Sequence, residues 1–306
     1  MKAAVITASR KLEVVSTPLP EPRAEEVRVR IEGCGICASS LPVWQGREWF
    51  NYPRNPGEPG HEGWSVVDAI GDNVTNVREG DRVAFLSNRA FAEFDIATSD
   101  SLVQLPGELA GRTFPGEALG CAMNIFRRSD IQPGQTVAVI GAGFLGNLLV
   151  QLAKSAGARV IAMSRRESAR ELAKACGADE TYAMHEIPQQ PVERVIECVG
   201  LQEALDVATR IIGERGRLVI AGYHQDGLRH INVQQWNWLG IDVINAHERD
   251  PRNYVRGMQD AVDAVIAGRI DPWPLLTHQY ALDELGRGLE DASTRPDGFV
   301  KGTVYV

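Results

Sequence analysis

The chain has 306 residues, of which 44% are hydrophobic and 24% are charged, and its formal net charge is −8 at pH 7. This length is enough for two domains with separate cores, and the acidic balance argues against nucleic acid or an anionic membrane surface as the main partner. No apolar run approaches the ~18 residues that a membrane-spanning helix requires, so the sequence predicts no span.

The first 120 residues are typical of an irregular β domain. Short runs of alternating apolar residues occur at 27–33, 64–71, 81–86 and 92–97, and Gly, Pro and Asn separate these runs. The extreme N-terminus alternates in the same way, like a strand, and it lacks the apolar core of a signal peptide. The five cysteines are an odd number without framework spacing, which favours a reducing cytoplasm.

Two residue groups in this β domain have the chemistry of metal ligands. Cys37 lies in GCGICASS, and His61 and Glu62 lie in PGEPGHEGW. A thiolate, an imidazole and a carboxylate suit Zn²⁺, and a catalytic zinc needs three protein ligands and an open position. Glu117, in FPGEALGC, is the best candidate for a further ligand. The alternatives are a small buried thiol, a hydrogen-bonded loop histidine, and a redox pair of Cys34 and Cys37, although nothing thioredoxin-like surrounds that pair.

A glycine-rich turn joins an apolar strand, residues 136–140, to an apolar helix. Gly141 is expected to make the tight turn, Gly143 to let the backbone approach a pyrophosphate, and Gly146 to let helix and strand pack closely. The helix then begins at Phe144 and Leu145 and directs its free N–H groups at the phosphates. A plain strand–turn–helix corner is the alternative, but the flanking elements favour a dinucleotide site. The helix is expected to bury four leucines: Leu145, Leu148, Leu149 and Leu152.

The residues after the next strand indicate which dinucleotide is bound. The strand at 159–163 ends in Ser164, Arg165 and Arg166. A site for NAD would place Asp or Glu here to bind the ribose hydroxyls, whereas a hydroxyl and two guanidiniums suit the 2′-phosphate of NADP. The alternative is that the arginines are solvated surface charges, or that Glu167 pairs with one of them. We favour NADP(H) over NAD(H).

Strands and helices continue to alternate after residue 131, which predicts a doubly wound parallel sheet and an α/β fold. A helix at about 254–267, a loop and a closing strand at 302–306 follow. The closing strand needs a sheet to join, and the N-terminal β domain is the obvious one. We therefore expect one domain from residues 1–120 plus 250–306, with a dinucleotide-binding domain of residues 121–249 inserted into it.

The chain resembles the medium-chain dehydrogenases/reductases, in the zinc alcohol and polyol dehydrogenase branch. The resemblance implies a GroES-like catalytic domain around an inserted Rossmann domain. The matching stretches follow the family's order along the chain: residues 33–37, 60–74, 78–83, 91–94, 139–158 and 295–306.

The resemblance also implies a ligand set. It places catalytic zinc at Cys37 and His61, with Glu62 and Glu117 at two carboxylate positions. In sorbitol and threonine dehydrogenases these two carboxylates exchange on and off the metal. Cys121 is the fallback ligand.

The sequence departs from the family pattern in four places. The four closely spaced cysteines of the structural zinc lobe are missing after 81–83, so we expect one zinc per chain. Ser40 stands where the family usually has an Asp that braces the metal region, a change that weakens metal affinity by about tenfold or more. Pro42 replaces a common proton-relay His, and Ser65 replaces a usual glycine.

The expected reaction is hydride transfer between NADP(H) and a secondary alcohol or its ketone. Zinc would act as a Lewis acid on the substrate oxygen, held by Cys37, His61 and Glu62, and Ser39 would take or relay the hydroxyl proton. A polyol, sugar or cyclitol is the leading substrate class, ahead of a simple secondary alcohol. We expect a homodimer or homotetramer by family resemblance.

Two groups of residues are candidates for contact with the substrate. Each has a structural alternative, which is packing for the aromatic group and turn formation for the polar group. The aromatic group follows the zinc cysteine and comprises Trp44, Trp49, Phe50 and Tyr52. The polar group follows the last two strands of the Rossmann domain and comprises His224, Asn245, His247 and Glu248.

Two other functions are compatible with the same fold. One is a zinc-free reductase of enones or quinones, and the other is a non-enzymatic NADPH-binding sensor. The ligand-like residues Cys37, His61, Glu62 and Glu117 argue against both, because a pure binding protein has no use for a Lewis acid.

Overall fold

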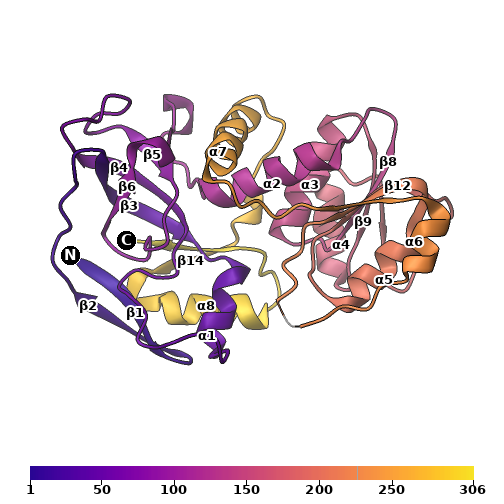
Figure 1. Ribbon diagram of the computed structural model, residues 1–306, viewed down its shortest axis with the longest axis horizontal. Coiled ribbons are helices and arrows are strands. Elements are labelled where there is room, and N and C mark those ends of the chain that lie inside the picture. The colour runs from indigo at the N-terminus through magenta and orange to yellow at the C-terminus, as the bar shows by residue number, and fades with distance from the viewer. Residues whose placement is uncertain (226) are drawn as a thin grey trace. The chain divides into compact units, whose positions relative to one another are not determined.

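A computed structural model of the chain describes residues 1–225 and 227–306. It divides into two compact units, which we call the β-rich unit and the α/β unit. The β-rich unit comprises Met1–Cys121, Asp250–Ile266 and Trp273–Val306, and it contains both chain ends (Figure 1). The α/β unit comprises Ala122–Arg249 and Ala267–Pro272.

The β-rich unit is built on a seven-stranded sheet and a separate hairpin. The sheet has the order β14-β15-β3-β4-β5-β7, with β6 paired to β3. Its strands are β3 (Glu26–Gly35), β4 (Glu62–Ile70), β5 (Arg82–Phe85), β6 (Phe94–Thr98), β7 (Leu102–Gln104), β14 (His278–Ala281) and β15 (Gly302–Tyr305). The helices of its segments are α1 (Leu41–Gln45), α2 (Gly116–Ser129, which the division between the units crosses), α7 (Pro251–Ile266) and α8 (Leu285–Thr294). Short 3-10 helices occur at Ala38–Ser40 (η1), Ser99–Ser101, Gly107–Leu109, Trp273–Leu275 and Leu282–Glu284.

The N-terminal segment forms two strands where the alternation predicted one. β1 (Lys2–Ala8) and β2 (Lys11–Ser16) pair antiparallel as a hairpin. Arg10 occupies the turn with a φ of 55°, in the left-handed region that non-glycine residues rarely adopt. Alternation has the same period on both sides of such a turn, so it does not reveal where the chain reverses.

The C-terminal strand joins the sheet of the first hundred residues, as expected. β15 pairs antiparallel with β3, where Val304 lies opposite Cys34, and parallel with β14. The loop predicted before it is wrong, because that segment forms β14 and α8. Leu285, Leu289 and Ala292 are buried in α8 at helical spacing. This spacing is the feature of the sequence that could have predicted the helix.

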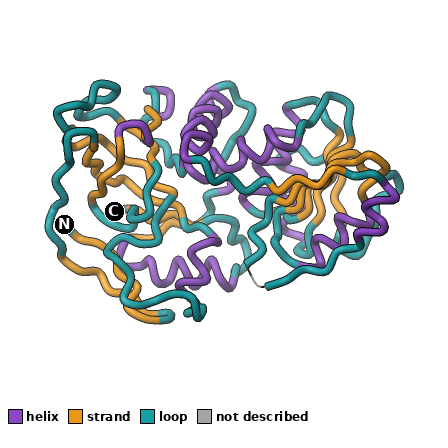
Figure 2. Tube along the Cα trace, viewed as in Figure 1, coloured by secondary structure: helices purple, strands orange, loops and turns teal. Residues whose placement is uncertain are grey.

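The α/β unit contains the predicted parallel sheet. Its strand order is β10-β9-β8-β11-β12-β13, so the first strand in sequence lies next to the fourth, as in doubly wound dinucleotide-binding folds. Figure 2 shows these strands gathered in one layer with helices packed along it. The strands are β8 (Thr136–Ile140), β9 (Arg159–Met163), β10 (Glu180–Tyr182), β11 (Val192–Glu197), β12 (Ile212–Ile220) and β13 (Asp242–Asn245). The helices are α3 (Phe144–Ser155), α4 (Glu167–Ala175), α5 (Gln202–Ile211) and α6 (Val233–Leu239).

Helix α3 buries three of the four expected leucines. Leu148, Leu149 and Leu152 are fully buried, whereas Leu145 is only half-buried. Leu145 lies in the first turn of α3, beside the glycine-rich loop, where less of the sheet covers the helix. The expectation that Leu145 is a core residue is therefore wrong.

Residues 267–272 group with the α/β unit, where the sequence analysis assigned them to the other domain. The Gln151 side chain of α3 donates a hydrogen bond to the carbonyl of Asp271 at 3.1 Å and accepts one from its N–H at 2.5 Å. These two bonds tie the short segment to α3. No helix in the described residues is long and apolar enough to cross a bilayer.

Trp64 provides a test of the packing in the β-rich unit. Its side chain is 1% exposed and its ring lies edge-on to Tyr305 at 5.7 Å. Replacing Trp64 with alanine should lower the free energy of unfolding by about 3–5 kcal/mol, because a large cavity would remain. Trp49→Ala is the matched control: Trp49 is 60% exposed, so its loss should change stability by less than about 0.5 kcal/mol. Equal urea-unfolding curves for the two variants would contradict this packing.

Candidate functional site

Strand pairing brings the predicted metal ligands together. β3 and β4 are antiparallel, and Gly35 at the end of β3 lies opposite Glu62 at the start of β4. Cys37 follows β3 by two residues, and His61 immediately precedes β4. The register therefore places Cys37 beside His61 and Glu62, although the two segments are separated in sequence.

Gly35 leaves the space that the Glu62 carboxylate needs. A Cβ atom at Gly35 would lie 1.9 Å from Oε2 of Glu62, which no side chain can tolerate. The glycine is thus required by a close side-chain approach and not by a left-handed φ. Any other residue at this position would displace Glu62 from the group.

Three donor atoms converge at this point. Cys37, His61 and Glu62 each offer one ligand atom, and these atoms lie within 4.8 Å of one another. Among the described residues, no other group of three such side chains meets this criterion. Ser39, in η1, lies beside them, with its Oγ 3.2 Å from Sγ of Cys37 and 3.2 Å from Nε2 of His61.

The surroundings of His61 direct one ring nitrogen into the group. Nδ1 lies 2.8 Å from the carbonyl oxygen of Pro59, which can only accept, so Nδ1 carries a proton. In the neutral ring Nε2 therefore has the lone pair that a metal needs. Burial lowers the pKa of His61, but the nearby Cys37, Glu117 and Glu62 together raise it to about 10. The same negative field favours a bound cation.

Glu117 lies close to this group but outside its three members. It is in the first turn of α2, and its Oε1 accepts a hydrogen bond from Sγ of Cys121 at 3.2 Å. Burial raises the pKa of Glu117, His61 lowers it, and Glu62 raises it further. The pKa of the Cys121 thiol is held well above its usual range by burial and by Glu117. Cys121 is therefore a neutral donor to the carboxylate.

Lys301 is a member of this site that the sequence analysis missed. Its Nζ lies 2.6 Å from both carboxylate oxygens of Glu62, and the side chains are 8% and 1% exposed. Burial lowers the pKa of Lys301, whereas Glu62, Cys37 and Glu117 raise it. The only local indication of this role in the sequence is that a lysine directly precedes the apolar closing strand.

The donor set fits zinc. A sulfur, an imidazole nitrogen and a carboxylate oxygen are ligands that zinc takes in proteins. Here Cys37 and His61 are half-buried and Glu62 is buried. Oε2 of Glu62 makes no hydrogen bond, so it retains capacity to contact a cation. The site could also hold a different divalent metal that accepts sulfur and nitrogen ligands.

The positions that depart from the family pattern are buried. Ser40 and Ser65 are 1% and 0% exposed, and neither hydroxyl has a hydrogen-bond partner among the described residues. Pro42 is also buried, in α1. Ser40 does not supply the charge of the family's usual Asp, and Pro42 does not supply the proton path of the family's usual His.

The aromatic candidates for substrate contact divide into packed and exposed side chains. Trp44 is 5% exposed and its Nε1 donates to Glu290 at 3.1 Å, so it is a core residue. Phe50 and Tyr52 pack against the same core, and the Tyr52 hydroxyl donates to the carbonyl of Val43. Trp49 alone is largely exposed.

In the α/β unit, the glycine-rich turn has the geometry that its sequence predicted. Gly141 has a φ of 100°, which favours glycine. A Cβ at Gly143 would meet nothing within 4 Å, so this part of the backbone is open to a ligand. A Cβ at Gly146 would lie 1.9 Å from the carbonyl oxygen of Gly141, so α3 and the turn can approach only without it.

The arginines after β9 are available to a ligand. Arg165 is exposed and Arg166 half-buried, and within residues 1–225 and 227–306 neither guanidinium forms a hydrogen bond or ion pair. No ion pair with Glu167 is present in that part of the chain. Arg170 instead shapes the turn, because its NH1 donates to the carbonyls of Ser164 and Arg165 at 2.9 and 3.0 Å.

The polar residues after β12 and β13 form hydrogen bonds within the α/β unit. Nε2 of His224 lies 3.0 Å from the buried carboxylate of Glu197, and Nε of Arg229 donates a hydrogen bond to Nδ1 of His224 at 3.0 Å. Asn245 Oδ1 accepts from the N–H of His247, whose exposed ring stacks on Tyr223 at 6.0 Å.

Glu248 makes a similarly local bond. Its Oε1 accepts from the N–H of Arg249, the next residue. Asn245 and Glu248 therefore show the local bonding expected of residues that form turns.

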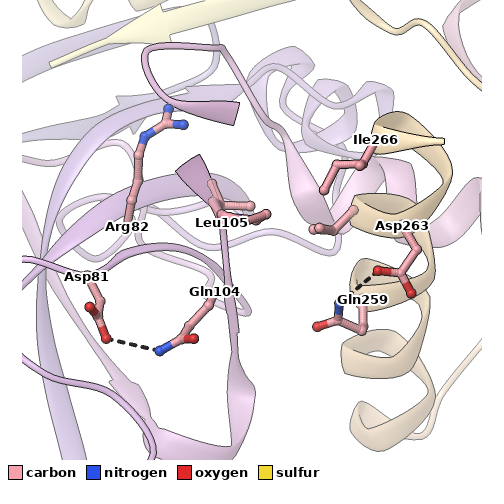
Figure 3. Close-up of a pocket in the computed structure, with 9 residues that line it drawn as sticks. Asp81, Arg82, Gln104, Leu105, Gln259, Asp263 and Ile266 are labelled. Carbon is pink, nitrogen blue, oxygen red and sulfur yellow. Dashed lines mark hydrogen bonds between the residues drawn. The ribbon is translucent and has the colours of Figure 1, made fainter. Parts of the chain in front are cut away.

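One cavity of about 320 Å³ lies in the β-rich unit, apart from the metal ligands. Figure 3 shows two polar pairs on its wall: Gln104 donates to Asp81 at 3.0 Å, and Gln259 donates to Asp263 at 3.2 Å. These side chains satisfy one another, and none of the residues around this cavity belongs to the ligand group. The lining residues are Asp81, Arg82, Gln104, Leu105, Pro106, Gln259, Val262, Asp263 and Ile266.

Comparison with known proteins agrees with this geometry. Residues 23–122 match the family model of the alcohol dehydrogenase GroES-like domain, and residues 145–267 match that of the zinc-binding dehydrogenases. An alcohol dehydrogenase of Geobacillus stearothermophilus is 32% identical over 331 residues, covering 94% of this chain and 97% of the relative. A sorbitol dehydrogenase of Bacillus subtilis (strain 168) is 26% identical and covers 100% of this chain and 97% of its own length.

A solved structure shows the same fold over the whole chain. It is a protein of Sinorhizobium meliloti 1021, described as a zinc-binding dehydrogenase bound to NADP, and it is 25% identical to this chain. The TM-score is 0.87, and the alignment covers 100% of this chain and 99% of that one. The chain belongs to the zinc-dependent alcohol and polyol dehydrogenases of the medium-chain dehydrogenase/reductase superfamily.

Proposed function

We propose that this enzyme transfers hydride between NADP(H) and a secondary alcohol or ketone at a single catalytic zinc. The observation that carries the proposal is the convergence of Cys37, His61 and Glu62, whose ligand atoms lie within 4.8 Å of one another. Glu117 is the further carboxylate near this group. Zinc, when bound, polarises the substrate oxygen as a Lewis acid.

Each side chain of the site has a separate task in this reaction. Cys37 and His61 hold the metal, and the Pro59 carbonyl fixes the orientation of the His61 ring. The Ser39 hydroxyl would accept the substrate hydroxyl proton and pass it outward. Its contacts at 3.2 Å with Sγ of Cys37 and Nε2 of His61, and its exposure, support this role.

The α/β unit would hold the cofactor at its glycine-rich turn. The pyrophosphate would approach Gly143 and the N-terminus of α3, at Phe144 and Leu145. The unpaired guanidiniums of Arg165 and Arg166, with the Ser164 hydroxyl, would bind the 2′-phosphate of NADP. The NADP bound by the Sinorhizobium meliloti relative supports this preference.

A polyol, sugar or cyclitol is the proposed substrate class. The sorbitol dehydrogenase relative supports it, because that protein's name specifies a polyol. In this chain the exposed Trp49 and His247 offer rings that could stack on a polyol. Trp44 is less suited to contact with a substrate because it is buried.

Metal analysis tests the proposed function. Wild type purified without chelator should contain about one zinc per chain, and Cys37→Ala should lose it, because three protein ligands are the minimum for a catalytic site. Cys176→Ala is the control, because Cys176 lies at the end of α4 in the other unit and should leave zinc unchanged. A wild type that stays free of zinc after supplementation, but reduces enones with NADPH, would identify the zinc-free reductase instead.

The cofactor preference has its own test. Arg165→Ala should weaken NADPH binding roughly 10- to 100-fold, since a hydrogen bond to a charged group contributes about 1.5–3 kcal/mol. NADH binding should change little, because NADH has no 2′-phosphate. Fluorescence titration with both cofactors measures the ratio, with Lys174→Ala, on the exposed side of α4, as the control. An equal loss for both cofactors would contradict the proposed role of Arg165.

A further inference from the structure

A closed circuit of hydrogen bonds ties the loop that follows β11 (residues 198–201, the β11 loop) to the residues that follow β12. Glu197 ends β11, and its side chain is 0% exposed. Its Oε1 accepts hydrogen bonds from the N–H groups of Val199 and Gly200, both at 2.7 Å. Its Oε2 lies 3.0 Å from Nε2 of His224, which follows β12. One carboxylate therefore fixes the β11 loop with one oxygen and reaches the neighbouring segment with the other.

Arg229 closes the circuit. Its Nε donates to Nδ1 of His224 at 3.0 Å, and its Nη2 donates to the carbonyl of Gly200 at 3.0 Å. Because a guanidinium can only donate, Nδ1 of His224 accepts, and the proton of the neutral imidazole lies on Nε2, where it meets Glu197. The contacts thus run from Glu197 through His224 and Arg229 to Gly200 and back to Glu197, and they select one tautomer of His224.

The backbones of the two segments also touch. A Cβ at Gly222 would lie 2.3 Å from the nitrogen of Gly200, and a Cβ at Gly200 would lie 2.5 Å from the carbonyl oxygen of Tyr223. The N–H groups of Ala221 and Gly222 donate to the carbonyl of Glu197 at 2.8 and 2.7 Å. The β11 loop is therefore held on the β12 side by backbone contacts as well as by the circuit.

On its other side the β11 loop borders the glycine-rich turn. A Cβ at Gly141 would lie 2.6 Å from Cγ2 of Val199, so the loop packs directly against the turn. β8 and β11 are neighbours at the point where the strand order of the sheet reverses. A doubly wound fold binds a dinucleotide across this point, with one half on each side. Arg165, after β9, would take the adenosine half, which leaves the β11 loop to the nicotinamide half.

We propose that His224 and Arg229 are positioning residues that hold the β11 loop where it contacts the nicotinamide half of the cofactor. This inference rests on the proposed binding of NADP(H) to the α/β unit. Loss of His224 takes the donor away from Oε2 of the buried Glu197 and separates Arg229 from the circuit. The β11 loop is then less ordered before binding, and the cost of ordering it weakens the contact with nicotinamide.

Two ligands separate the halves of the cofactor. NADPH carries both halves, whereas adenosine 2′,5′-bisphosphate carries only the adenosine half with its 2′-phosphate. His224→Phe keeps a ring of similar size and removes both hydrogen bonds of the imidazole. We expect it to weaken NADPH binding about tenfold, the scale of one lost hydrogen bond, and to change bisphosphate binding by less than about twofold. Isothermal titration calorimetry measures both affinities.

His230→Phe is the matched control. His230 is exposed in the same segment, and its hydrogen bonds with Gln202 use the backbone of His230, which the substitution keeps. It should change neither affinity. Arg165→Ala should weaken both ligands, because both carry the 2′-phosphate. A variant that affects NADPH alone therefore acts on the nicotinamide half.

A second variant keeps the test decisive if His224→Phe does not fold. Arg229→Gln leaves the bond between Glu197 and His224 in place but removes the guanidinium that closes the circuit, so it should also weaken NADPH more than the bisphosphate. Thermal unfolding establishes that each variant is folded. A folded variant that loses both ligands equally would show a merely structural role and overturn the proposal, as would an unchanged affinity for NADPH.

Failure of this inference differs from failure of the proposed function. If wild type binds neither NADPH nor the bisphosphate, the proposed cofactor site itself fails. If wild type binds both ligands through Arg165, and the His224 and Arg229 variants keep its affinity for NADPH, the cofactor site stands and only the role of the circuit is lost.

Discussion

The pairing of the C-terminal end of β3 with β4 and with β15 is the constraint on which the site depends. Gly35 lies opposite Glu62 on β4 and opposite Thr303 on β15, so one glycine stands between two segments from distant parts of the chain. This register brings Cys37 to His61 on one side and Lys301 to Glu62 on the other. Because a strand alternates its faces, a shift of one residue would turn these side chains away from one another.

Burial strengthens the interactions among the charged side chains that this strand register brings together. Solvent screens charges at the surface, but the Glu62 and Lys301 side chains are almost completely enclosed. The fold therefore keeps negative charges next to a histidine whose pKa they raise to about 10, although burial itself lowers that pKa. Each of these negative charges raises the pKa of the other groups nearby, and a bound cation would relieve the mutual repulsion of Glu62 and Glu117.

Sequence reasoning predicted what local patterns encode. The turn at Gly141 and Gly146 was predicted because each glycine meets a steric limit that its immediate neighbours impose. The sequence could not reveal Lys301, which lies 239 residues from its partner Glu62, because no local pattern specifies a contact of that range. α8 was missed for a different reason: its buried positions follow helical spacing, but the segment also contains glycine and polar residues typical of loops.

The two units use charge under different physical conditions. Arg165 is exposed, so it can bind a phosphate with little loss of hydration, and salt weakens its attraction. Lys301 is buried, so its interaction with Glu62 is screened much less, but it demands a fixed partner and a balanced total charge. Changing a surface arginine would therefore alter one proposed ligand contact. Changing the buried lysine alters the charge balance of every group in the metal site, because Glu62, Cys37 and Glu117 all act on it.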